Sequence, residues 1–437
     1  MMTIKEMMAR PRGATAMAAM RALVLAVAFA TVGIPVVSWA QQVPDAAAGA
    51  NRPKMDSAAN GVPVVDIVAP NARGVSHNKY QRFDVDQRGV ILNNSASIVK
   101  TQLGGYIAGN DNLKGGEASL ILNEVTSALP SSLRGYIEVG GKAAPVVIAN
   151  PYGITCDGCG VINSQRFTLT TGTPVFGGSG SLDAFHVAGG SIAIGSGGLD
   201  GSVVDRTDLI ARAVQVNGQI WAKELNVVAG ANDANYADAG VRANAADAAR
   251  PGVAIDVAAL GGMYAEKIRL VGTEAGVGVV SSGAIAAQAG DLELTSAGEV
   301  RLGGTTVALN NATLRAAGPV TIDGTFGTQA GNVYLAALGP LAVRGRVIAA
   351  GSLALDAASG VDNAGIAVSG GRFDIRTGGF TNRAGGVVSS GGELALSATG
   401  DLINDGILVG GNSLGVTARG IASRGELGTQ QGNASLA

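Results

Sequence analysis

Short runs of alternating apolar and polar residues recur along the carboxy-terminal third of the chain, about every twenty residues. Alternation with a period of two is typical of a strand that buries one face and exposes the other. A regular spacing of such strands predicts a repeat architecture in which each unit packs against its neighbours. The runs open at Leu292, Leu314, Val333, Leu353, Phe373, Leu394 and Leu414.

Glycine and asparagine keep the same period at other places in the repeat. A glycine at a fixed position indicates a corner that needs a left-handed backbone or the close approach of another segment. Asparagines at one corner can stack and hydrogen-bond from one repeat to the next. The glycines are Gly298, Gly318, Gly339, Gly360, Gly379, Gly400 and Gly420, and the asparagines are Asn363, Asn382 and Asn404.

These patterns predict an all-β protein, a right-handed parallel β-helix with coils of about twenty residues and an amino-terminal β cap. Each coil is expected to hold three short strands and three corners, and residues 75–437 leave room for about eighteen coils. The leucine-rich repeat and the calcium-binding Gly-Gly-x-Gly-x-Asp repeat do not fit, because their patterns are missing from the sequence.

Composition supports this fold class. Glycine accounts for 67 of the 437 residues, hydrophobic residues for 47% and charged residues for 15%. This mixture excludes disorder, which needs low hydrophobicity and high charge, and it would weaken the helices of a helical enzyme. Outside the first 40 residues, 27 basic and 32 acidic residues remain, so the chain offers no basic surface for nucleic acid.

The first 40 residues are typical of a secretory signal peptide. A basic stretch ends at Arg21, an apolar run follows over residues 22–37, and a small-x-small cleavage site predicts cutting between Ala40 and Gln41. The alternative is a membrane anchor, but the apolar run contains Pro35 and is shorter than the ~20 residues that a spanning helix needs.

Cys156 and Cys159 are the two cysteines of the chain and form a Cys-x-x-Cys pair. In an exported protein such a pair indicates a structural disulfide that fixes one turn, although free thiols, a redox site or a metal site remain alternatives. A zinc site would need two more ligands, and His77 and His186 are the two histidines available. We expect His77 to have a packed, hydrogen-bonded role.

One short segment resembles a catalytic motif. Residues 411–415 fit G-x-S-x-G, but Leu414 falls on a repeat strand rather than on the strand-to-helix turn that this motif requires. We therefore expect no catalytic residues, no cofactor and no metal.

Residues 62–300 resemble the secretion domain of two-partner-secreted exoproteins, the filamentous haemagglutinin and contact-dependent-inhibition class. The resemblance rests on segments that occur in the family's order: residues 71–94, 103–113, 118–127, 133–139, 150–154 and 260–277. Asn110, Asn112 and Leu113 correspond to the family's NPNL motif. Asn150, Pro151, Tyr152, Gly153 and Ile154 correspond to its NPNGI motif, just before the cysteines.

The resemblance implies that these two motifs belong to the region that the transporter recognises. The structural alternative is that the asparagines cap turns while Leu113 and Ile154 pack inward. Asp111 replaces the proline of the first motif and Tyr152 replaces the second asparagine of NPNGI. The first change loses a fixed φ and the second loses a turn-capping amide, so recognition or turn geometry is expected to change.

The resemblance also implies partners and a location. The unfolded chain would cross the inner membrane through the general secretory translocon and engage a dedicated outer-membrane barrel transporter. It would then fold coil by coil at the surface of a Gram-negative bacterium or be released. A host or bacterial surface receptor or a glycan is a further expected partner.

The expected domains are a signal peptide (1–40), a leader to the cap (41–70), the secretion domain (71–300) and haemagglutinin repeats cut short at the end of the chain (301–437).

The main functional hypothesis is a non-enzymatic adhesin. The alternative is the delivery end of a contact-dependent inhibition toxin whose toxic domain is absent. A polysaccharide lyase is a third hypothesis, but the sequence shows no recurring Asp, Lys and Arg on one coil face. Residues 229–252 interrupt the repeat and are expected to form a loop or short helix.

Overall fold

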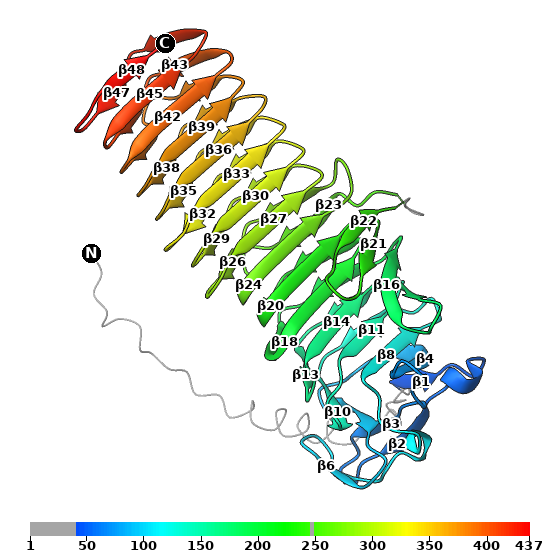
Figure 1. The fold of residues 1–437 in the computed structure, drawn as a ribbon. Helices are drawn as coiled ribbons and strands as arrows, with labels where there is room; N and C mark the ends of the chain where they lie inside the picture. The colour runs from blue at the N-terminus through cyan, green and yellow to red at the C-terminus, as the bar shows by residue number, and fades with distance from the viewer. Residues whose placement is uncertain (1–40, 245–248) are drawn as a thin grey trace, which may run out of the picture. The chain divides into compact units, whose positions relative to one another are not determined.

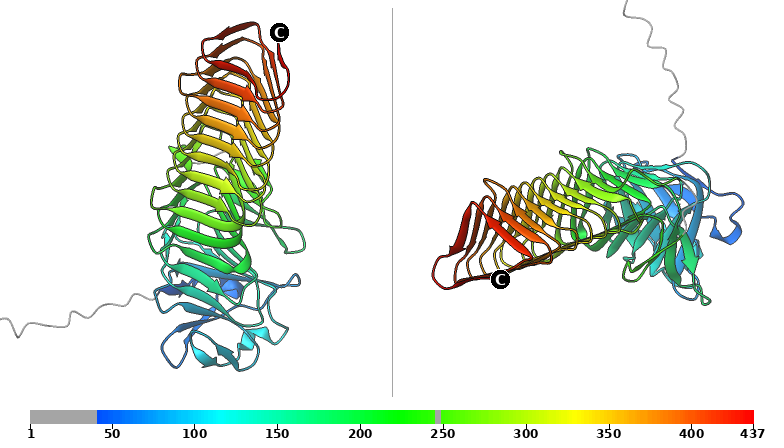
Figure 2. Two further views of the ribbon diagram at one scale, coloured as in Figure 1. Left: turned by 90° about the vertical axis from the view of Figure 1, so that its left-hand side faces the viewer. Right: turned by 90° about the horizontal axis from the view of Figure 1, so that it is seen from above.

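A computed structural model describes residues 41–244 and 249–437, and these residues form a stack of parallel β coils behind a cap of mixed strands (Figures 1 and 2). The predicted all-β parallel solenoid is therefore confirmed. The stack has about 15 turns of about 21 residues. The expected export signal, including Ala40, lies outside the described residues.

Each regular coil contains three strands in a fixed order, and the equivalent strands of successive coils form three rows. Strands of one row pair in parallel with those of the coils before and after, so backbone hydrogen bonds run along the stack. The first row contains β5 (Val90–Asn94), β10 (Tyr136–Gly141), β13 (Cys159–Ile162), β26 (Ala284–Ala287), β29 (Thr305–Ala308), β32 (Thr325–Thr328), β35 (Arg346–Ala349), β38 (Ile366–Ser369), β41 (Val387–Ser390), β44 (Ile407–Gly410) and β47 (Glu426–Thr429).

The second row contains the apolar runs that the sequence reveals. Its strands are β4 (Val75–Phe83), β8 (Leu120–Val125), β11 (Val146–Ala149), β14 (Arg166–Thr170), β27 (Leu292–Ser296), β30 (Ala312–Ala316), β33 (Val333–Ala337), β36 (Leu353–Ala357), β39 (Phe373–Thr377), β42 (Glu393–Ala398), β45 (Ser413–Thr417) and β48 (Ala434–Leu436). The predicted openings agree to within two residues. Leu314 is the second inward residue of β30, because it pairs with Leu294 and Leu335.

The third row forms a separate sheet of 13 strands. It contains β9 (Ser131–Leu133), β12 (Ile154–Cys156), β17 (Ser191–Ile194), β19 (Ala213–Val216), β23 (Val253–Val257), β25 (Gly278–Ser281), β28 (Val300–Leu302), β31 (Val320–Ile322), β34 (Leu341–Val343), β37 (Val361–Asn363), β40 (Phe380–Asn382), β43 (Asp401–Asn404) and β46 (Gly420–Ser423).

Three long strands join the first two rows into one sheet. They are β18 (Leu199–Ala211), β20 (Gln219–Ala229) and β24 (Gly262–Gly272). The start of β18 pairs with β13 of the first row, and its end pairs with β14 of the second row. In the middle of the stack, two faces of a coil are therefore a single bent strand, which the period of the array does not predict.

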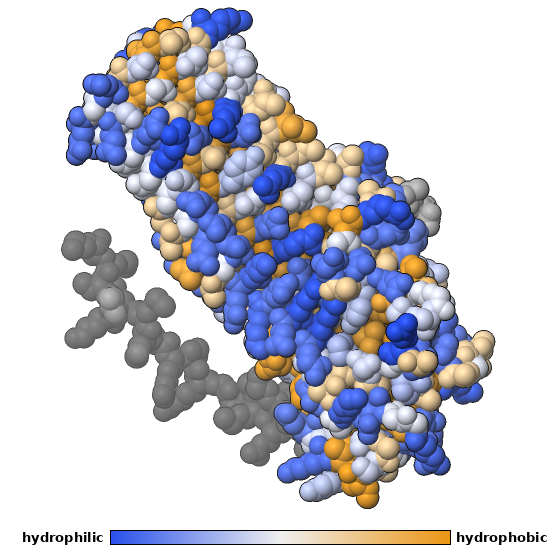
Figure 3. All heavy atoms as spheres, viewed as in Figure 1, coloured by the Kyte–Doolittle hydropathy of each residue, from blue (hydrophilic) through white to orange (hydrophobic). Residues whose placement is uncertain are grey.

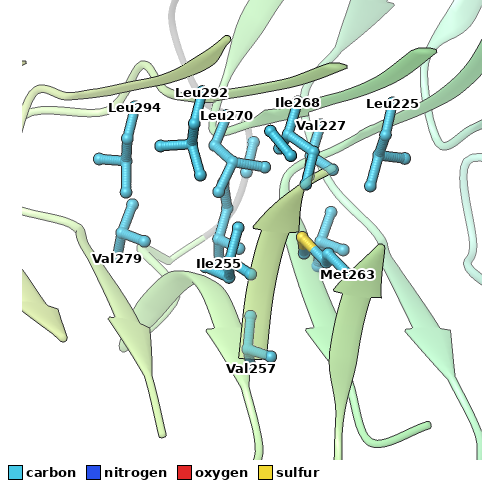
Figure 4. Close-up of a cluster of buried hydrophobic side chains, with 14 of the residues drawn as sticks. Leu225, Val227, Ile255, Val257, Met263, Ile268, Leu270, Val279, Leu292 and Leu294 are labelled. Atoms are coloured by element: carbon cyan, nitrogen blue, oxygen red, sulfur yellow. The ribbon is translucent and has the colours of Figure 1, made fainter. Parts of the chain in front are cut away.

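Polar and apolar residues are mixed over the outer face seen in Figure 3, whereas apolar side chains from all three rows fill the narrow interior of the coils (Figure 4). The inward positions of β27 are Leu292 and Leu294, both buried, while Glu293 between them is exposed. Each inward side chain lies above its equivalent in the next coil, so the core is continuous along the stack. Figure 4 shows this for Leu225, Val227, Ile255, Val257, Met263, Ile268, Leu270, Val279, Leu292 and Leu294.

The repeated glycines are needed mainly where coils approach closely. A Cβ at Gly298 would lie 2.4 Å from the carbonyl oxygen of Val277, whereas Gly360 has a left-handed φ of 139°. Both expected reasons for glycine therefore occur. A second column, which the sequence reasoning missed, lies at the corner before the first row. It contains Gly304, Gly324, Gly345, Gly365, Gly406 and Gly425, where a Cβ would lie 2.0–2.2 Å from a glycine carbonyl oxygen of the coil below.

The expected asparagine ladder is confirmed. Asn363 Nδ2 donates to Asn382 Oδ1 at 2.8 Å, and Asn382 Nδ2 donates to Asn404 Oδ1 at 2.8 Å. Asn404 Nδ2 then donates to Ser423 Oγ at 3.0 Å. The three asparagines are buried, and this continuous chain gives each Nδ2 an acceptor, while Asn363 Oδ1 at the start of the ladder is buried without a partner.

Three excursions leave the coils. The hairpin of β6 (Val99–Thr101) and β7 (Gly105–Ile107), followed by the 3₁₀ helix η2 (Asp111–Leu113), lies between β5 and β8. The other two, β15 (Thr173–Phe176) with β16 (Leu182–Val187), and β21 (Asn232–Asn235) with β22 (Val241–Ala243), form one antiparallel four-stranded sheet. The interruption expected over 229–252 is thus an excursion from the coils, but the expected loop or short helix is wrong for β21 and β22, because β21 pairs with β16 and β22 pairs with β21.

Residues 41–70, expected to lead into the cap, form part of it. β1 (Gln42–Pro44) pairs antiparallel with β4, and β2 (Lys54–Ser57) pairs antiparallel with β3 (Pro63–Asp66), which in turn pairs with β5. A short 3₁₀ helix, η1 (Gly49–Asn51), lies between β1 and β2. The cap and the excursions take up residues that regular coils would have used, so there are fewer coils than the eighteen expected.

Replacing Gly345 with alanine tests the glycine column. The new Cβ would lie 2.0 Å from the Gly324 carbonyl oxygen and 2.5 Å from that of Asp323, and neither backbone atom can yield without shifting a coil. We expect Gly345→Ala to cost about 1–3 kcal/mol and to lower the urea unfolding midpoint. The matched control is Gly415→Ala, whose Cβ would have no heavy atom within 4 Å. Equal midpoints for the two variants would contradict this account.

Candidate functional site

The first motif fastens an excursion to the cap. Asn110 is the N-cap of η2, and its Oδ1 accepts a hydrogen bond from the Asn112 backbone N–H at 3.0 Å. Its Nδ2 donates to the carbonyl oxygens of Ile67 at 2.9 Å and Asn93 at 3.0 Å. Asn110 is buried, and the two hydrogen bonds that its Nδ2 donates are shielded from water. This residue holds the turn in place and presents no side chain to a partner.

The remaining residues of the first motif divide between core and surface. Leu113 is buried in the hydrophobic core. Asn112 is exposed, although its Nδ2 reaches the Ile67 carbonyl oxygen at 3.1 Å. The Asp111 side chain is 93% exposed and lies in the first turn of η2, where a carboxylate is compatible with the free backbone N–H groups. Asp111 and Asn112 are therefore the motif's solvent-facing part.

The second motif forms the corner between β11 and β12. Asn150 Oδ1 accepts a hydrogen bond from the Tyr152 backbone N–H at 3.0 Å, and the Asn150 carbonyl oxygen accepts one from Gly153 N–H at 3.1 Å. Asn150 Nδ2 donates to the Leu129 carbonyl oxygen at 2.9 Å and to Ser131 Oγ at 3.0 Å. The corner is thus tied to the coil below it.

Tyr152 does not hold this corner. Its side chain is 55% exposed, whereas Asn150 and Ile154 are buried and Gly153 supplies the left-handed φ of 119°. The turn-capping amide is therefore that of Asn150, and replacing the family's second asparagine by tyrosine changes the surface of the turn. Pro151 is partly exposed beside it.

The two motifs share one design. In each, a buried asparagine accepts from the backbone N–H two residues later and donates to a neighbouring segment, while the residues just after it face solvent. Asn110 is tied to the cap and Asn150 to the coil of β9. Among the hydrogen bonds of residues 41–244 and 249–437, none joins the two turns directly.

The two cysteines form a disulfide across the corner between β12 and β13, with Cα atoms 5.3 Å apart. Both are buried. Between them, Asp157 accepts a hydrogen bond from Gly197 N–H at 2.7 Å and donates its backbone N–H to the Leu133 carbonyl oxygen at 2.8 Å. This small ring connects the coil below to the coil above.

A buried charge cluster supports the four-stranded sheet, and sequence reasoning missed it. The Asp208 carboxylate is fully buried between Arg166 Nε at 2.6 Å and Arg206 Nε at 2.8 Å. The Arg166 guanidinium lies 4.1 Å from the ring centroid of Tyr236, and Arg206 Nη1 donates to the Ala237 carbonyl oxygen. Arg166 and Asp208 are 42 residues apart, so no local spacing could have revealed the pair.

Both histidines are bound to carboxylates. His77 Nε2 lies 2.6 Å from Glu124 Oε2, which agrees with the hydrogen-bonded role expected for His77. His186 Nδ1 lies 2.6 Å from Asp233 Oδ1 across β16 and β21. This hydrogen bond is the main cause that lowers the pKa of Asp233, with further help from Asn244 and Arg242. His77 and His186 do not approach the cysteines as ligands of one site.

Within the described ranges, no three His, Cys, Asp or Glu side chains gather as a metal site. Nor does any helix in this part of the chain have the length and apolar character to cross a membrane. Ser413 lies in β45, inside the parallel stack, and so outside any nucleophile elbow.

Comparison with protein families decides the identity of this region. The model described as the TPS secretion domain matches residues 40–302. The chain belongs to the two-partner secretion family. The TPS domain covers the cap, the excursions, both motifs and the disulfide, and it ends at β28 of the regular array.

Curated relatives of the TPS domain are toxins. The chain is 54% identical over 253 residues to Toxin CdiA of Yersinia pestis, 52% over 283 residues to 16S rRNA endonuclease CdiA of Enterobacter cloacae, and 49% over 291 residues to tRNA nuclease CdiA-2 of Burkholderia pseudomallei. The matches cover 58%, 62% and 66% of this chain but only 8–9% of the relatives' length.

A solved structure shares both the fold and the family. The crystal structure of the filamentous hemagglutinin secretion domain is 32% identical in sequence and has a TM-score of 0.59. The match covers 73% of this chain and 100% of the chain in that crystal structure.

Asn150→Ala tests whether the buried asparagine is structural. The variant loses three side-chain hydrogen bonds and leaves buried groups without partners, so we expect a destabilisation of about 1–3 kcal/mol in urea unfolding. Asn112→Ala removes one exposed amide and should stay within about 0.5 kcal/mol of the parent. The reverse order of the two effects would contradict the assignment.

Acid should loosen the antiparallel sheet. The pKa of Asp233 is lowered in the folded state, so its ionised carboxylate stabilises the fold. This stabilisation is complete at a pH above the ordinary Asp pKa of about 3.9, and it is lost as the pH falls through the lowered pKa. Hydrogen exchange of β16 and β21, corrected for intrinsic rates, should therefore speed up below pH ~4. Asp233→Asn should show faster exchange already at pH ~5 and little further change. An identical acid response in both proteins would contradict this explanation.

Proposed function

We propose that this chain is the export-directing part of a contact-dependent inhibition toxin, carried across the outer membrane by a partner transporter. The observation that carries the proposal is the 49–54% identity to proteins named as CdiA toxins and nucleases, against 32% to the filamentous hemagglutinin secretion domain. The adhesin hypothesis is the weaker of the two on this comparison.

The toxic activity would belong to another part of the full-length protein. The TPS domain itself is non-catalytic, and the relatives' nuclease names describe proteins of which this chain spans less than a tenth. The described coils would then act as the leading end of a delivery stalk. Exoproteins of this family are secreted or exposed at the surface of Gram-negative bacteria, and the TPS domain implies an outer-membrane transporter as partner.

The exposed residues of the two motifs are the proposed transporter contacts. Asp111, Asn112 and Tyr152 extend into solvent beside buried residues that fix their backbone. Asn110, Leu113, Asn150 and Ile154 act indirectly in this proposal, because they hold the turns, and Pro151 and Gly153 shape the second turn. A partner would thus contact exposed side chains, of which Asn112 also donates one hydrogen bond to the Ile67 carbonyl oxygen.

The parallel stack also suits directional export through the general secretory translocon and then the transporter. A coil that emerges pairs with the edge of the coil already outside, so folding needs no long loop to close. The disulfide closes a ring between Cys156 and Cys159, three residues apart, so it demands no folded coil before threading.

Secretion tests the recognition role. Cells that express this chain with its partner transporter should release it to the medium, and Asn112→Ala should lower the released amount at least about tenfold, or about 1.4 kcal/mol of recognition. The matched control is Asn310→Ala, an exposed asparagine in a turn of the regular array. Far-UV circular dichroism and urea unfolding of the purified variants would check that both fold.

Three outcomes separate the hypotheses. Release that depends on the transporter and on Asn112 supports the proposal. Release without the transporter contradicts the two-partner route, and normal release of Asn112→Ala removes this residue from the recognition surface. Growth inhibition of neighbouring cells by the full-length protein, lost with the transporter, would favour the toxin over the adhesin.

A further inference from the structure

Three aromatic side chains, Tyr136, Trp221 and Tyr264, lie along an outward stripe of the first row and its joined strands. The pairing register places Tyr136, Gly160, Asp200, Trp221 and Tyr264 at equivalent positions of five successive strands. These residues belong to β10, β13, β18, β20 and β24, and each of these strands pairs with the strands next to it. The stripe therefore has a rigid base.

The rings of the stripe are held in fixed positions. Trp221 stacks on Tyr264 with centroids 4.6 Å apart and planes 18° from parallel, yet 43% of Trp221 remains exposed. The Tyr136 ring extends over Gly160, and a Cβ at position 160 would lie 2.5 Å from this ring. The Tyr136 hydroxyl donates to Asp200 Oδ2 at 2.8 Å. Only glycine at position 160 leaves room for this ring.

A groove of about 390 Å³ lies between these rings and the adjoining corners. Its polar side chains are the Asp200 carboxylate, the exposed amides of Asn217 and Gln219 and the exposed hydroxyl of Ser196. Its apolar walls include Trp221, Tyr136 and the 89% exposed Leu260. Glycines provide its floor, since a Cβ at Gly218 would lie 2.0 Å from the Gly195 carbonyl oxygen. The volume falls in the range of small-molecule sites.

The chemistry of the groove restricts its ligand. No lysine or arginine lines it, so it does not suit a phosphate or sulfate. Asp200 is its one carboxylate and already accepts from Tyr136 and Ser202, which leaves no cluster for a metal ion. Because β18 and β20 are paired on both sides, no free strand edge is available to a peptide.

We propose that this groove binds a neutral saccharide. An exposed indole face packs against the C–H face of a pyranose ring, while a carboxylate and two amides around it bond to the hydroxyls. Trp221 Nε1 donates a hydrogen bond to Gln219 Oε1 at 3.3 Å, so the indole and this amide lie close enough together to contact the same sugar ring. The site lies within the TPS domain but does not depend on the transporter, so it stands whether or not the proposed toxin delivery is correct.

Tryptophan fluorescence tests the groove directly. Trp39 and Trp221 are the two tryptophans of the chain, so a purified chain carrying Trp39→Phe reports on Trp221 alone. Titration with maltotriose, cellotriose and tri-N-acetylchitotriose should give a saturable change for at least one trisaccharide. The glucose and N-acetylglucosamine trisaccharides distinguish a capsule-type glucan from a cell-wall-type glycan.

Variants decide whether the change comes from the groove. Gln219→Ala and Asp200→Ala should each weaken binding at least about tenfold, while Tyr334→Ala, an aromatic on an outward position of the array, should leave it unchanged. Because Asp200 anchors Tyr136, the exposed Gln219 provides the variant that leaves the fold intact. No saturable change up to about 10 mM, or equal binding by Gln219→Ala and the parent, would overturn the proposal.

Discussion

The hydrogen-bonded contact between one coil and the next is the interaction on which the rest of this structure depends. Each strand of the array finds its backbone partners in the coils directly below and above it, as β27 does with β24 and β30. A coil alone would leave its peptide groups unpaired and its narrow interior open to water. The cap provides the first edge, because β3 and β10 pair with either side of β5.

This contact explains which residues the array tolerates at its corners. Carbonyl oxygens of one coil approach the glycine of the next so closely that Gly324 and Gly345 leave no room for a side chain. Where a corner is wider, an asparagine such as Asn382 bonds to its equivalents above and below. Small or self-complementary residues therefore recur with the period of the coil. The same rule places no packing demand on a residue of the motif turns that faces solvent, such as Tyr152.

The regular array could be predicted because its pattern repeats in the sequence, whereas the parts of the fold that occur once could not. The sequence period predicted the coil length and the second-row strands, which recur along the array, and the asparagine ladder, which recurs in three successive coils. The joined strands β18, β20 and β24 and the antiparallel sheet occur once, and their contacts link residues as distant as Arg166 and Asp208. The motifs were located from their resemblance to a family, but a single sequence could not show that Asn110 and Asn150 are buried while Asn112 is exposed.

Fully buried aromatic rings lie both where the stack begins, as Tyr80 does, and in the regular array, as Phe326 and Phe373 do, so the size of the core side chains favours neither end. Because the cap provides the first edge on which a coil can pair, we expect folding to start in the cap and to advance coil by coil. Pulsed hydrogen exchange during refolding of the chain tests this most directly. We expect the strands of residues 75–170 to gain protection before those of residues 300–437. Protection of the array first, or of both regions in one step, would contradict it.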